Sequence, residues 1–513
     1  MSGYLRRLAT TGAAYTAASI VSKLIAVVLL PLYTRYLTPA DYGAAEVMFA
    51  AIVSVSIIVR LGTIEALLRF YYKDDEDPAQ VVATSFAALF WVATAAALIL
   101  LPFAKPISEA LLDESAPDLA RIAIGGLWVS TMFEYLLTLF RLEERARAFF
   151  VTTLLSVISA ISLTVVLVVG AGEGARGLLL GSYASGAVFV LGLIWLHRRR
   201  LSLWFDRALL RRLMRFGLPT MPAELSLYLL NFVDRIIIVR TVGLAEAGLY
   251  SLAVKFAQGV NVLVRGFQLA WPPLAYSIRD DGEARRTYAV VVTLFSAGCA
   301  FVVTGMWLLS RWIVRALTTP EFFGSYKAIG LLATAVTLYA LYMVLVVILG
   351  RTGRTEFNFP ATAAALATNI ALNLALVPPF GIVGAGIALV ASYIVVLALM
   401  YSFTQRLFPV PYEWGRLARV IAVSTGLVIS GELLLPTEGF LGLLARTALW
   451  LTYPLALLAT GFFTPGERRW LATLRSPGVL AAQLRSLRPA AAAVDGSVPE
   501  TYEAEQMDED ARP

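Results

Sequence analysis

The sequence predicts an all-α polytopic membrane protein, with about 14 transmembrane helices in two parallel-repeat six-helix lobes plus two C-terminal helices. Three observations lead to this prediction. Hydrophobic residues make up 59% of the chain and charged residues only 15%, whereas soluble domains carry about 25% charged residues. Apolar runs of about 20 residues, each long enough to cross the hydrocarbon core as a helix, recur along nearly the whole chain. The first and second halves also share an internal repeat.

The apolar runs set the expected helices and the division of the chain. The first run lacks the A-x-A cleavage pattern of a signal peptide and is read as a retained span. We expect an N-lobe over 1–197, a basic cytoplasmic linker over 198–214, a C-lobe over 215–410, a final helix pair over 411–464, and a partly disordered cytoplasmic tail over 465–513. The expected helices lie near residues 12–37, 42–69, 80–104, 118–140, 149–170, 177–196, 215–240, 247–277, 287–310, 327–350, 358–377, 383–408, 416–435 and 440–463.

Basic residues alternate between connections, which predicts the topology. The net charge is +7, and cytoplasmic connections carry an excess of Lys and Arg. We therefore expect both termini on the cytoplasmic side of the membrane. The connections expected to be cytoplasmic contain residues such as Arg6, Arg69, Arg141, Arg147, Arg198, Arg211, Arg279, Arg286, Arg351, Arg406 and Arg419.

Cysteine and histidine usage limits the chemistry. The single cysteine, Cys299, excludes an intramolecular disulfide and a multi-cysteine metal site. A single histidine, His197, argues against a histidine-based zinc or haem site. The sequence contains no G-x-x-x-x-G-K-[ST] loop for nucleotide phosphates. We therefore expect no cofactor and no metal site. We also expect a protein that is not an enzyme and that binds no nucleic acid, because the positive-inside rule accounts for the net positive charge.

The internal repeat appears when the first two spans are aligned without gaps on the seventh and eighth. The offset is 205, since 265 minus 60 is 205, and it pairs charged residues as well as glycines. Parallel repeats of this kind place a substrate path between two similar bundles and suit alternating access. The most informative pairs are Arg35 with Arg240, Asp41 with Glu246, Gly43 with Gly248, and Arg60 with Arg265.

Cationic residues inside the spans are the candidate substrate-binding residues. A charged side chain at bilayer depth costs at least about 2.5–3.5 kcal/mol, so it should face a wet cavity or a partner. Lys23, Arg60, Lys255 and Arg265 would form a cationic lining of the path. In the alternative, the arginines snorkel to cytoplasmic headgroups or pair inside their own bundle, as Arg60 could with Glu65.

Further polar residues follow the two repeated spans at helical spacing. Glu46 and Ser56 on the second span, and Gln258, Asn261 and Gln268 on the eighth, would form polar stripes along the cavity. The gating or coupling candidates are Asp234, Arg235, Glu134 and Glu224. Asp234 and Arg235 could pair with each other or latch onto the facing bundle. Glu134 and Glu224 could be proton or sodium sites, or equally paired structural carboxylates.

Several motifs together give the chain a family resemblance over about residues 5–465. The chain resembles the polysaccharide-transport branch of the multidrug/oligosaccharidyl-lipid/polysaccharide exporter superfamily, the Wzx-type flippases of O-antigen and lipid-linked oligosaccharides. The motifs are Ser22-Lys23-Leu24, Tyr36-Leu37-Thr38-Pro39-Ala40-Asp41-Tyr42-Gly43, Arg215-Phe216-Gly217-Leu218-Pro219, Asp234-Arg235, Gly248-Leu249-Tyr250, Ala270-Trp271-Pro272-Pro273, and Asn369 with Asn373 before Pro378 and Gly381.

This resemblance implies a function and its partners. A flippase of this type lies in the bacterial inner membrane and moves undecaprenyl-pyrophosphate-linked oligosaccharide to the periplasmic leaflet for surface polysaccharide such as the O-antigen of lipopolysaccharide. A cationic lining suits that cargo, because a pyrophosphate needs positive partners when it leaves water. The implied partners are the lipid-linked oligosaccharide, membrane lipids and polysaccharide assembly proteins. The alternatives are a lipid II flippase, a membrane-embedded polysaccharide polymerase or ligase, and a scaffold for an envelope assembly complex.

Overall fold

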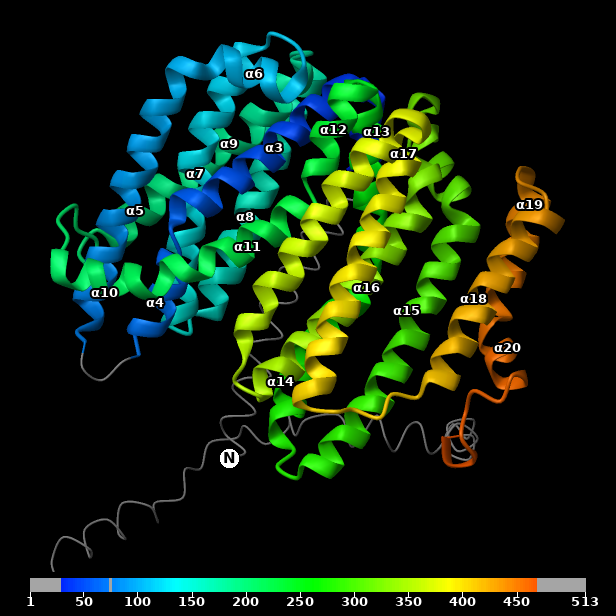
Figure 1. The fold of residues 1–513 in the computed structure, drawn as a ribbon. Coiled ribbons are helices and arrows are strands. Elements are labelled where there is room, and N and C mark those ends of the chain that lie inside the picture. Colours follow the sequence, from blue (N-terminus) through cyan, green and yellow to red (C-terminus); the bar gives the residue numbers. More distant parts are fainter. Residues whose placement is uncertain (1–28, 73–75, 468–513) are drawn as a thin grey trace, which may run out of the picture. The chain divides into compact units, whose positions relative to one another are not determined.

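The computed structural model describes residues 29–72 and 76–467, and every regular element in these ranges is helical. Figure 1 shows the fold, with α3, α5, α7, α8 and α9 on one side and α12 to α17 on the other. The helices are α2 Leu30–Tyr36, α3 Pro39–Arg60, α4 Thr63–Phe70, α5 Pro78–Leu100, α6 Ala104–Leu112, α7 Pro117–Leu142, α8 Ala146–Val165, α9 Gly174–His197, α10 Arg207–Gly217, α11 Met221–Leu230, α12 Val233–Thr241, α13 Leu244–Ala257, α14 Asn261–Ser277, α15 Asp281–Leu317, α16 Tyr326–Arg351, α17 Asn358–Leu407, α18 Trp414–Leu434, α19 Gly439–Leu451 and α20 Tyr453–Ala459.

Short helical turns join several of these elements. Five are 3₁₀ turns, and the segment after α8 is a π-helix. They are η1 Leu101–Phe103, η2 Val166–Gly170, η3 Leu218–Thr220, η4 Gln258–Val260, η5 Pro320–Ser325 and η6 Thr355–Phe357. Two of them, η3 and η4, adjoin helices that carry candidate site residues.

Ten helices in the described ranges are long and apolar enough to cross a membrane. The chain is therefore a multi-pass membrane protein, as the composition predicts. Most of the predicted first span lies outside the described residues, as does the tail from residue 468 onward. The predicted spans 358–377 and 383–408 form one continuous element, α17, that bends at Gly381, whose φ of 55° and ψ of −134° are not helical. Pro378 and Pro379 precede this bend, and each lacks the amide hydrogen that a helix interior requires.

Three predicted spans that carry candidate site residues are interrupted, which corrects their boundaries, and the span predicted over 440–463 is likewise divided into α19 and α20 at Thr452. The span predicted over 42–69 ends as α3 at Arg60, because Leu61 and Gly62 adopt left-handed φ angles of 49° and 68°. The span predicted over 215–240 is divided into α11 and α12 by the turn at Asn231 and Phe232. Between α13 and α14, the span predicted over 247–277 contains the 3₁₀ turn η4.

The helix starts agree with the internal repeat. α3 begins at Pro39 and α13 begins at Leu244, and 244 minus 39 is again 205. The N-cap of α3 is Thr38, whose hydroxyl accepts a hydrogen bond from the Asp41 amide at 3.1 Å, and the Asp41 carboxylate accepts one from the Thr38 amide at 3.3 Å. This capping box fixes the start of α3. The repeat therefore relates helix starts as well as residue types.

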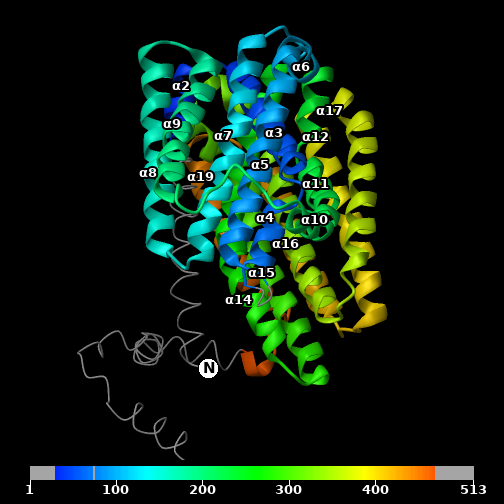
Figure 2. The ribbon, with the colours of Figure 1, turned by 90° about the vertical axis from the view of Figure 1, so that its left-hand side faces the viewer.

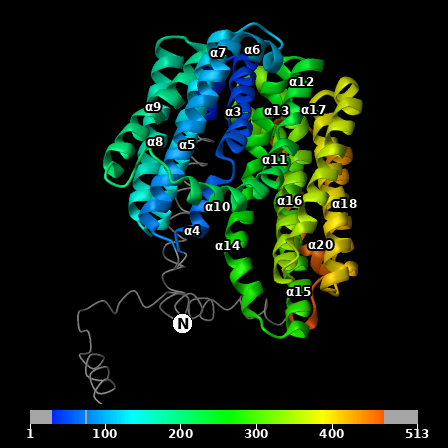
Figure 3. The ribbon, with the colours of Figure 1, turned by 60° about the vertical axis from the view of Figure 1, so that its left-hand side comes forward.

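The helices from residue 29 to 454 form one compact unit. Within it, α3 and α13 make the main contact between the earlier and the later helices, as Figure 3 shows. The repeat-related glycines lie at this contact. A Cβ atom on Gly43 would lie 2.2 Å from the Leu244 carbonyl oxygen, and one on Gly248 would lie 2.0 Å from the Pro39 carbonyl oxygen. Only glycine allows the two backbones to approach this closely.

An ionic cluster attaches the helix pair α18 and α19 to α15. Arg446 of α19 is 0% exposed, and its guanidinium donates to Glu432 of α18 at 2.6 Å and to the Pro436 carbonyl at 3.1 Å. The second carboxylate oxygen of Glu432 accepts from Arg311 of α15 at 3.2 Å. A buried arginine requires a charged partner, so Glu432 holds three helices together.

Candidate functional site

Arg60 lies at the carboxyl end of α3 between two carboxylates. Its Nη1 donates to Oε1 of Glu134 on α7 at 2.6 Å, and its Nη2 donates to Oε1 of Glu224 on α11 at 2.9 Å. The Arg60 side chain is 7% exposed, whereas the Glu134 and Glu224 side chains are 52% and 42% exposed. The guanidinium is therefore buried, and each carboxylate has an accessible side.

The break after α3 positions this guanidinium. A Cβ atom on Gly62 would lie 2.0 Å from the carbonyl oxygen of Gly217, the last residue of α10. Because Gly62 also has a φ of 68°, this turn requires glycine for both its conformation and its packing. Arg60 is thus the last residue of a helix whose end packs against α10.

A second ion pair also joins an early and a late helix. Nζ of Lys255 on α13 lies 2.5 Å from Oε1 of Glu46 on α3. The same Nζ lies 4.9 Å from the ring centroid of Tyr42, a distance that permits a cation–π interaction. The two side chains are 32% and 12% exposed, so the pair is mostly shielded. The predicted cations Arg60 and Lys255 are therefore both neutralised by carboxylates of the chain, and each bridges the two groups of helices.

The other two predicted cations have different surroundings. Arg265 is exposed on α14 and makes no hydrogen bond or ion pair within the part of the chain that the structure describes. Arg60 and Arg265 are paired by the repeat, yet one is buried and bonded twice and the other is open. Their difference follows from the backbone, because α3 ends at Arg60 whereas α14 continues through Arg265 to Ser277. Lys23 lies outside the described residues.

The predicted polar stripes are only partly exposed. Ser56 is 5% exposed, and its hydroxyl donates to the Val53 carbonyl of the same helix at 2.8 Å. On the later helices, Asn261 donates to the side-chain oxygen of Gln258. Gln268 is partly buried on α14 and has no hydrogen-bond partner among the described residues. Of the two stripes, Glu46 is the member that joins an interhelical charge pair.

Asp234 and Arg235 belong to a local network. Asp234 is 1% exposed and accepts hydrogen bonds from the Tyr250 hydroxyl and, at 2.8 Å, from the Arg235 amide. The Arg235 side chain donates to the Ser251 hydroxyl at 3.2 Å. Asp234, Arg235 and Tyr250 line a cavity of about 210 Å³, together with Asn231. Their bonds run between α12 and α13, which are neighbours in sequence, so the network is not a latch onto the facing helices.

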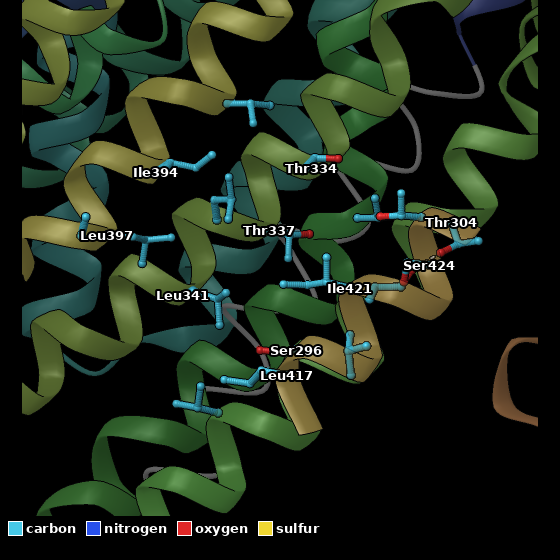
Figure 4. Close-up of a pocket in the computed structure, with 18 of the residues that line it drawn as sticks. Ser296, Thr304, Thr334, Thr337, Leu341, Ile394, Leu397, Leu417, Ile421 and Ser424 are labelled. Atoms are coloured by element: carbon cyan, nitrogen blue, oxygen red, sulfur yellow. Dashed lines mark hydrogen bonds between the residues drawn. The ribbon is translucent and has the colours of Figure 1, made fainter. Parts of the chain in front are cut away.

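A large apolar pocket lies among α15, α16, α17 and α18. It has a volume of about 900 Å³, and Figure 4 shows the side chains that surround it. Among the residues that the structure describes, no charged side chain lines it. Examples of its lining residues are Ser296, Thr304, Thr334, Thr337, Leu341, Ile394, Leu397, Leu417, Ile421 and Ser424. Sequence reasoning missed this pocket because its walls come from apolar positions on four helices, which look like any other lipid-facing or core positions.

Comparison with known proteins identifies a family and two relatives. The model of the polysaccharide biosynthesis protein family matches residues 32–327. A succinoglycan biosynthesis transport protein from Rhizobium meliloti (ExoT) is 26% identical over 310 residues, which cover 60% of this chain and 61% of that protein. A probable flippase from Haloferax volcanii (AglR) is 25% identical over 365 residues, covering 67% of this chain and 72% of that protein.

Two solved structures share the fold. The lipid II flippase MurJ in an inward closed conformation has a TM-score of 0.68 at 14% identity, with 87% of this chain and 97% of that chain covered. An inward-facing multidrug transporter of the MATE family, a member of the MOP superfamily, has a TM-score of 0.62 at 16% identity, with 74% and 94% covered. The family match of residues 32–327 spans 296 of the 513 residues, since 327 minus 31 is 296. The chain therefore belongs to the polysaccharide biosynthesis protein family.

Proposed function

We propose that this protein is a flippase that moves undecaprenyl-pyrophosphate-linked oligosaccharide across the bacterial inner membrane by alternating access, for surface polysaccharide biosynthesis. The observation that carries the proposal is two charge bridges between early and late helices, Arg60 with Glu224 and Lys255 with Glu46. Arg60 also pairs with Glu134 of the early helix α7. Burying a cation in membrane-spanning helices costs free energy, so such residues are usually functional. Binding an anionic substrate would be such a function.

The carboxylates would exchange with the substrate. In the described arrangement Glu134 and Glu224 occupy the two terminal nitrogens of Arg60, which are the nitrogens that a pyrophosphate would take in a bidentate contact. Because both carboxylates are about half exposed, they could turn toward water when the headgroup binds. Arg265, which is open, would meet the headgroup without such an exchange. Lys23 remains a proposed member of the same lining.

Alternating access would act on the contact between α3 and α13. The predicted topology places the starts of these two helices, at Pro39 and Leu244, on the periplasmic side. The close contact of Gly43 and Gly248 near these helix starts would therefore close the substrate path on the periplasmic side. The two-lobe division at 1–197 and 215–410 is part of this proposal. Opening the glycine contact would also separate Lys255 from Glu46, because the glycine contact and this ion pair both join α3 to α13.

The charged residues and the apolar surfaces would bind different parts of the substrate. A pocket without charged lining would exclude a pyrophosphate, because an unpaired charge is costly in an apolar site. The headgroup would therefore use the cationic residues, and the prenyl chain would stay in apolar surroundings. We propose a gating role for Glu134 and Glu224 through Arg60. For Asp234 and Arg235 we propose a coupling role, for which the buried position of Asp234 beside a polar cavity is the supporting observation.

The second candidate is a lipid II flippase, which is favoured by the fold shared with MurJ. Both substrates carry a pyrophosphate, so the cationic residues do not distinguish them. A polymerase or ligase would need catalytic residues on a large extracytoplasmic loop, and the longest predicted outer connection, 105–118, is short and lacks histidine.

The test is a reconstituted translocation assay. The purified protein is placed in liposomes with fluorescently labelled undecaprenyl-pyrophosphate oligosaccharide, lipid II, or phosphatidylcholine, and an impermeant quencher reports the outer leaflet. The proposal expects protein-dependent movement of the oligosaccharide lipid and none of phosphatidylcholine. Movement of lipid II alone would favour the second candidate. If neither pyrophosphate lipid moves faster than in protein-free liposomes, the flippase proposal is wrong.

A further inference from the structure

The connection between α9 and α11 carries an arginine-rich surface that the transport path does not use. α10 buries Leu209, Leu213 and Gly217 against the protein, while its charged residues face outward. α10 packs on α4 and α5, and Figure 2 shows the segment before it crossing the outer side of α5. Four exposed arginines of this region make no ion pair or hydrogen bond among the described residues, namely Arg199, Arg207, Arg211 and Arg215.

An exposed apolar segment precedes these arginines. Leu203, Trp204 and Phe205 are 48%, 88% and 40% exposed. The segment is nevertheless anchored, because Nε1 of Trp91 donates to the Leu203 carbonyl at 2.9 Å and the Asp206 amide donates to the Thr84 hydroxyl at 3.3 Å. The exposed Trp204 therefore projects from a fixed backbone, which is a poor arrangement in water and a good one at a membrane boundary.

The contacts that the segment makes along α5 show how far its residues lie from the predicted cytoplasmic end of that helix. Leu203 lies beside Trp91, which is 13 residues after Pro78 (91 minus 78), or about 20 Å along the helix. Asp206 lies beside Thr84, six residues after Pro78 (84 minus 78), or about 9 Å. Arg212 pairs with Glu76, just before α5 begins, at 2.9 Å. The apolar residues thus lie farther from the predicted cytoplasmic end of α5 than the arginine-bearing helix does.

We infer that residues 198–217 form a membrane-surface anchor that binds anionic phospholipid headgroups of the cytoplasmic leaflet through Arg199, Arg207, Arg211 and Arg215, with Leu203, Trp204 and Phe205 at the hydrocarbon boundary. Amphipathic helices with a basic polar face and adjoining aromatic residues lie in this interface. Juxtamembrane arginines are attracted to anionic lipids. An acidic protein partner would match the arginines, but it would leave Trp204 without an apolar environment.

This anchor also contacts the charged bridge. Gly217, at the end of α10, packs against Gly62, two residues after Arg60. Lipid binding by α10 would therefore hold the end of α3 in place. The inference does not depend on the identity of the transported substrate, so it can fail or hold independently of the proposed function.

The first test measures lipid binding by native mass spectrometry of the full-length protein in detergent. Phosphatidylglycerol and phosphatidylcholine are titrated against the wild type, the variant with Arg199, Arg207, Arg211 and Arg215 all changed to Gln, and a control in which Arg141, Arg147, Arg286 and Arg406 are changed to Gln. The control carries the same charge change on exposed arginines near the ends of other helices. We expect phosphatidylglycerol to bind at least about tenfold more weakly to the first variant and nearly unchanged to the control. Equal binding to both variants would overturn the assignment of these arginines.

The second test measures the depth of residue 204. Trp204→Cys in a Cys299→Ser background gives a single labelling site, because Cys299 is the chain's one cysteine. An environment-sensitive fluorophore at this site, in nanodiscs that contain phosphatidylglycerol, should emit at the short wavelength of an apolar environment and resist an aqueous quencher. A matched label at Glu144, an exposed residue of another connection, should remain quenchable. If emission and quenching at position 204 equal those at Glu144, the inference of a membrane anchor is wrong. The inference is also wrong if deletion of residues 495–513 alone removes the protection at position 204, because the acidic tail and not the membrane would then cover this position.

Discussion

Gly43 and Gly248 pack so closely that one added methyl group should disrupt the contact between α3 and α13, which tests the proposed conformational change. In Gly248→Ala the added methyl carbon would lie 2.0 Å from the Pro39 carbonyl oxygen and 3.1 Å from the Gly43 nitrogen. These are backbone atoms, so no side-chain rotation relieves the clash. Overpacking of this kind costs about 1–3 kcal/mol. If that cost falls only on the arrangement in which α3 touches α13, the equilibrium should shift away from it by about five- to 150-fold.

The assay is a distance measurement by electron spin resonance. Spin labels are placed at Tyr36 and Val242, which are 49% and 41% exposed near the starts of α3 and α13, in a Cys299→Ser background. Gly248→Ala should increase the population at longer distances. The matched control is Gly192→Ala on α9, because no atom lies within 4 Å of a Cβ atom placed there. A distance distribution for Gly248→Ala that matches the control would refute the view that this contact opens during transport.

Three further predictions follow from the charge pairs and the topology. Lys255→Met should lengthen the same spin-label distance. Adding Glu46→Gln to this variant should change the distance little, because the two residues form one ion pair at 2.5 Å. Additive effects of the two substitutions in a double-mutant cycle would contradict the pairing. Arg446→Met should destabilise the protein by about 3–5 kcal/mol, seen as a lower melting temperature in detergent, because it removes a fully buried partner of Glu432; an equal melting temperature for exposed Arg121→Met would contradict it. Reporter fusions after Leu201 and at the C-terminus should both be cytoplasmic, and an outward C-terminus would contradict the predicted two-lobe topology.

Much of the fold could be predicted from local sequence. The apolar runs predicted spanning helices, and ten helices in the described residues are long and apolar enough to cross a membrane, because length and hydropathy determine a spanning helix directly. The predicted number of 14 is not reached among the described residues. The repeat predicted that α3 and α13 occupy equivalent places, and their starts agree with its offset of 205. The break at Leu61 and Gly62 was missed because glycine is common in apolar helices, and its left-handed φ depends on packing against Gly217.

The candidate site was less predictable, because charge partners are set by tertiary structure. Sequence singled out Arg60, Glu134 and Glu224 separately, and the hypothesis for Arg60 offered Glu65 as its partner. The structure instead brings Arg60 to Glu134, 74 residues away, and to Glu224, 164 residues away. The same limit explains the unequal surroundings of Arg60 and Arg265, since a repeat in sequence conserves residue type but not the neighbouring helices. Sequence analysis did not single out Arg446, although it is a lone arginine within the apolar run 440–463.

The central claim is that Arg60 exchanges its two carboxylates for the pyrophosphate of the substrate, and translocation by matched variants tests it most directly. Rates of labelled undecaprenyl-pyrophosphate oligosaccharide movement are compared in liposomes for Arg60→Gln, Arg60→Lys, Arg265→Gln and the exposed control Arg121→Gln at equal protein content. Loss of one charge-assisted contact of about 1.5–3 kcal/mol predicts roughly ten- to 100-fold weaker substrate binding for Arg60→Gln and Arg265→Gln. Arg60→Lys should recover part of the affinity, because lysine keeps the charge but lacks the two-pronged donor. Full translocation and unchanged apparent affinity in both glutamine variants would contradict the claim.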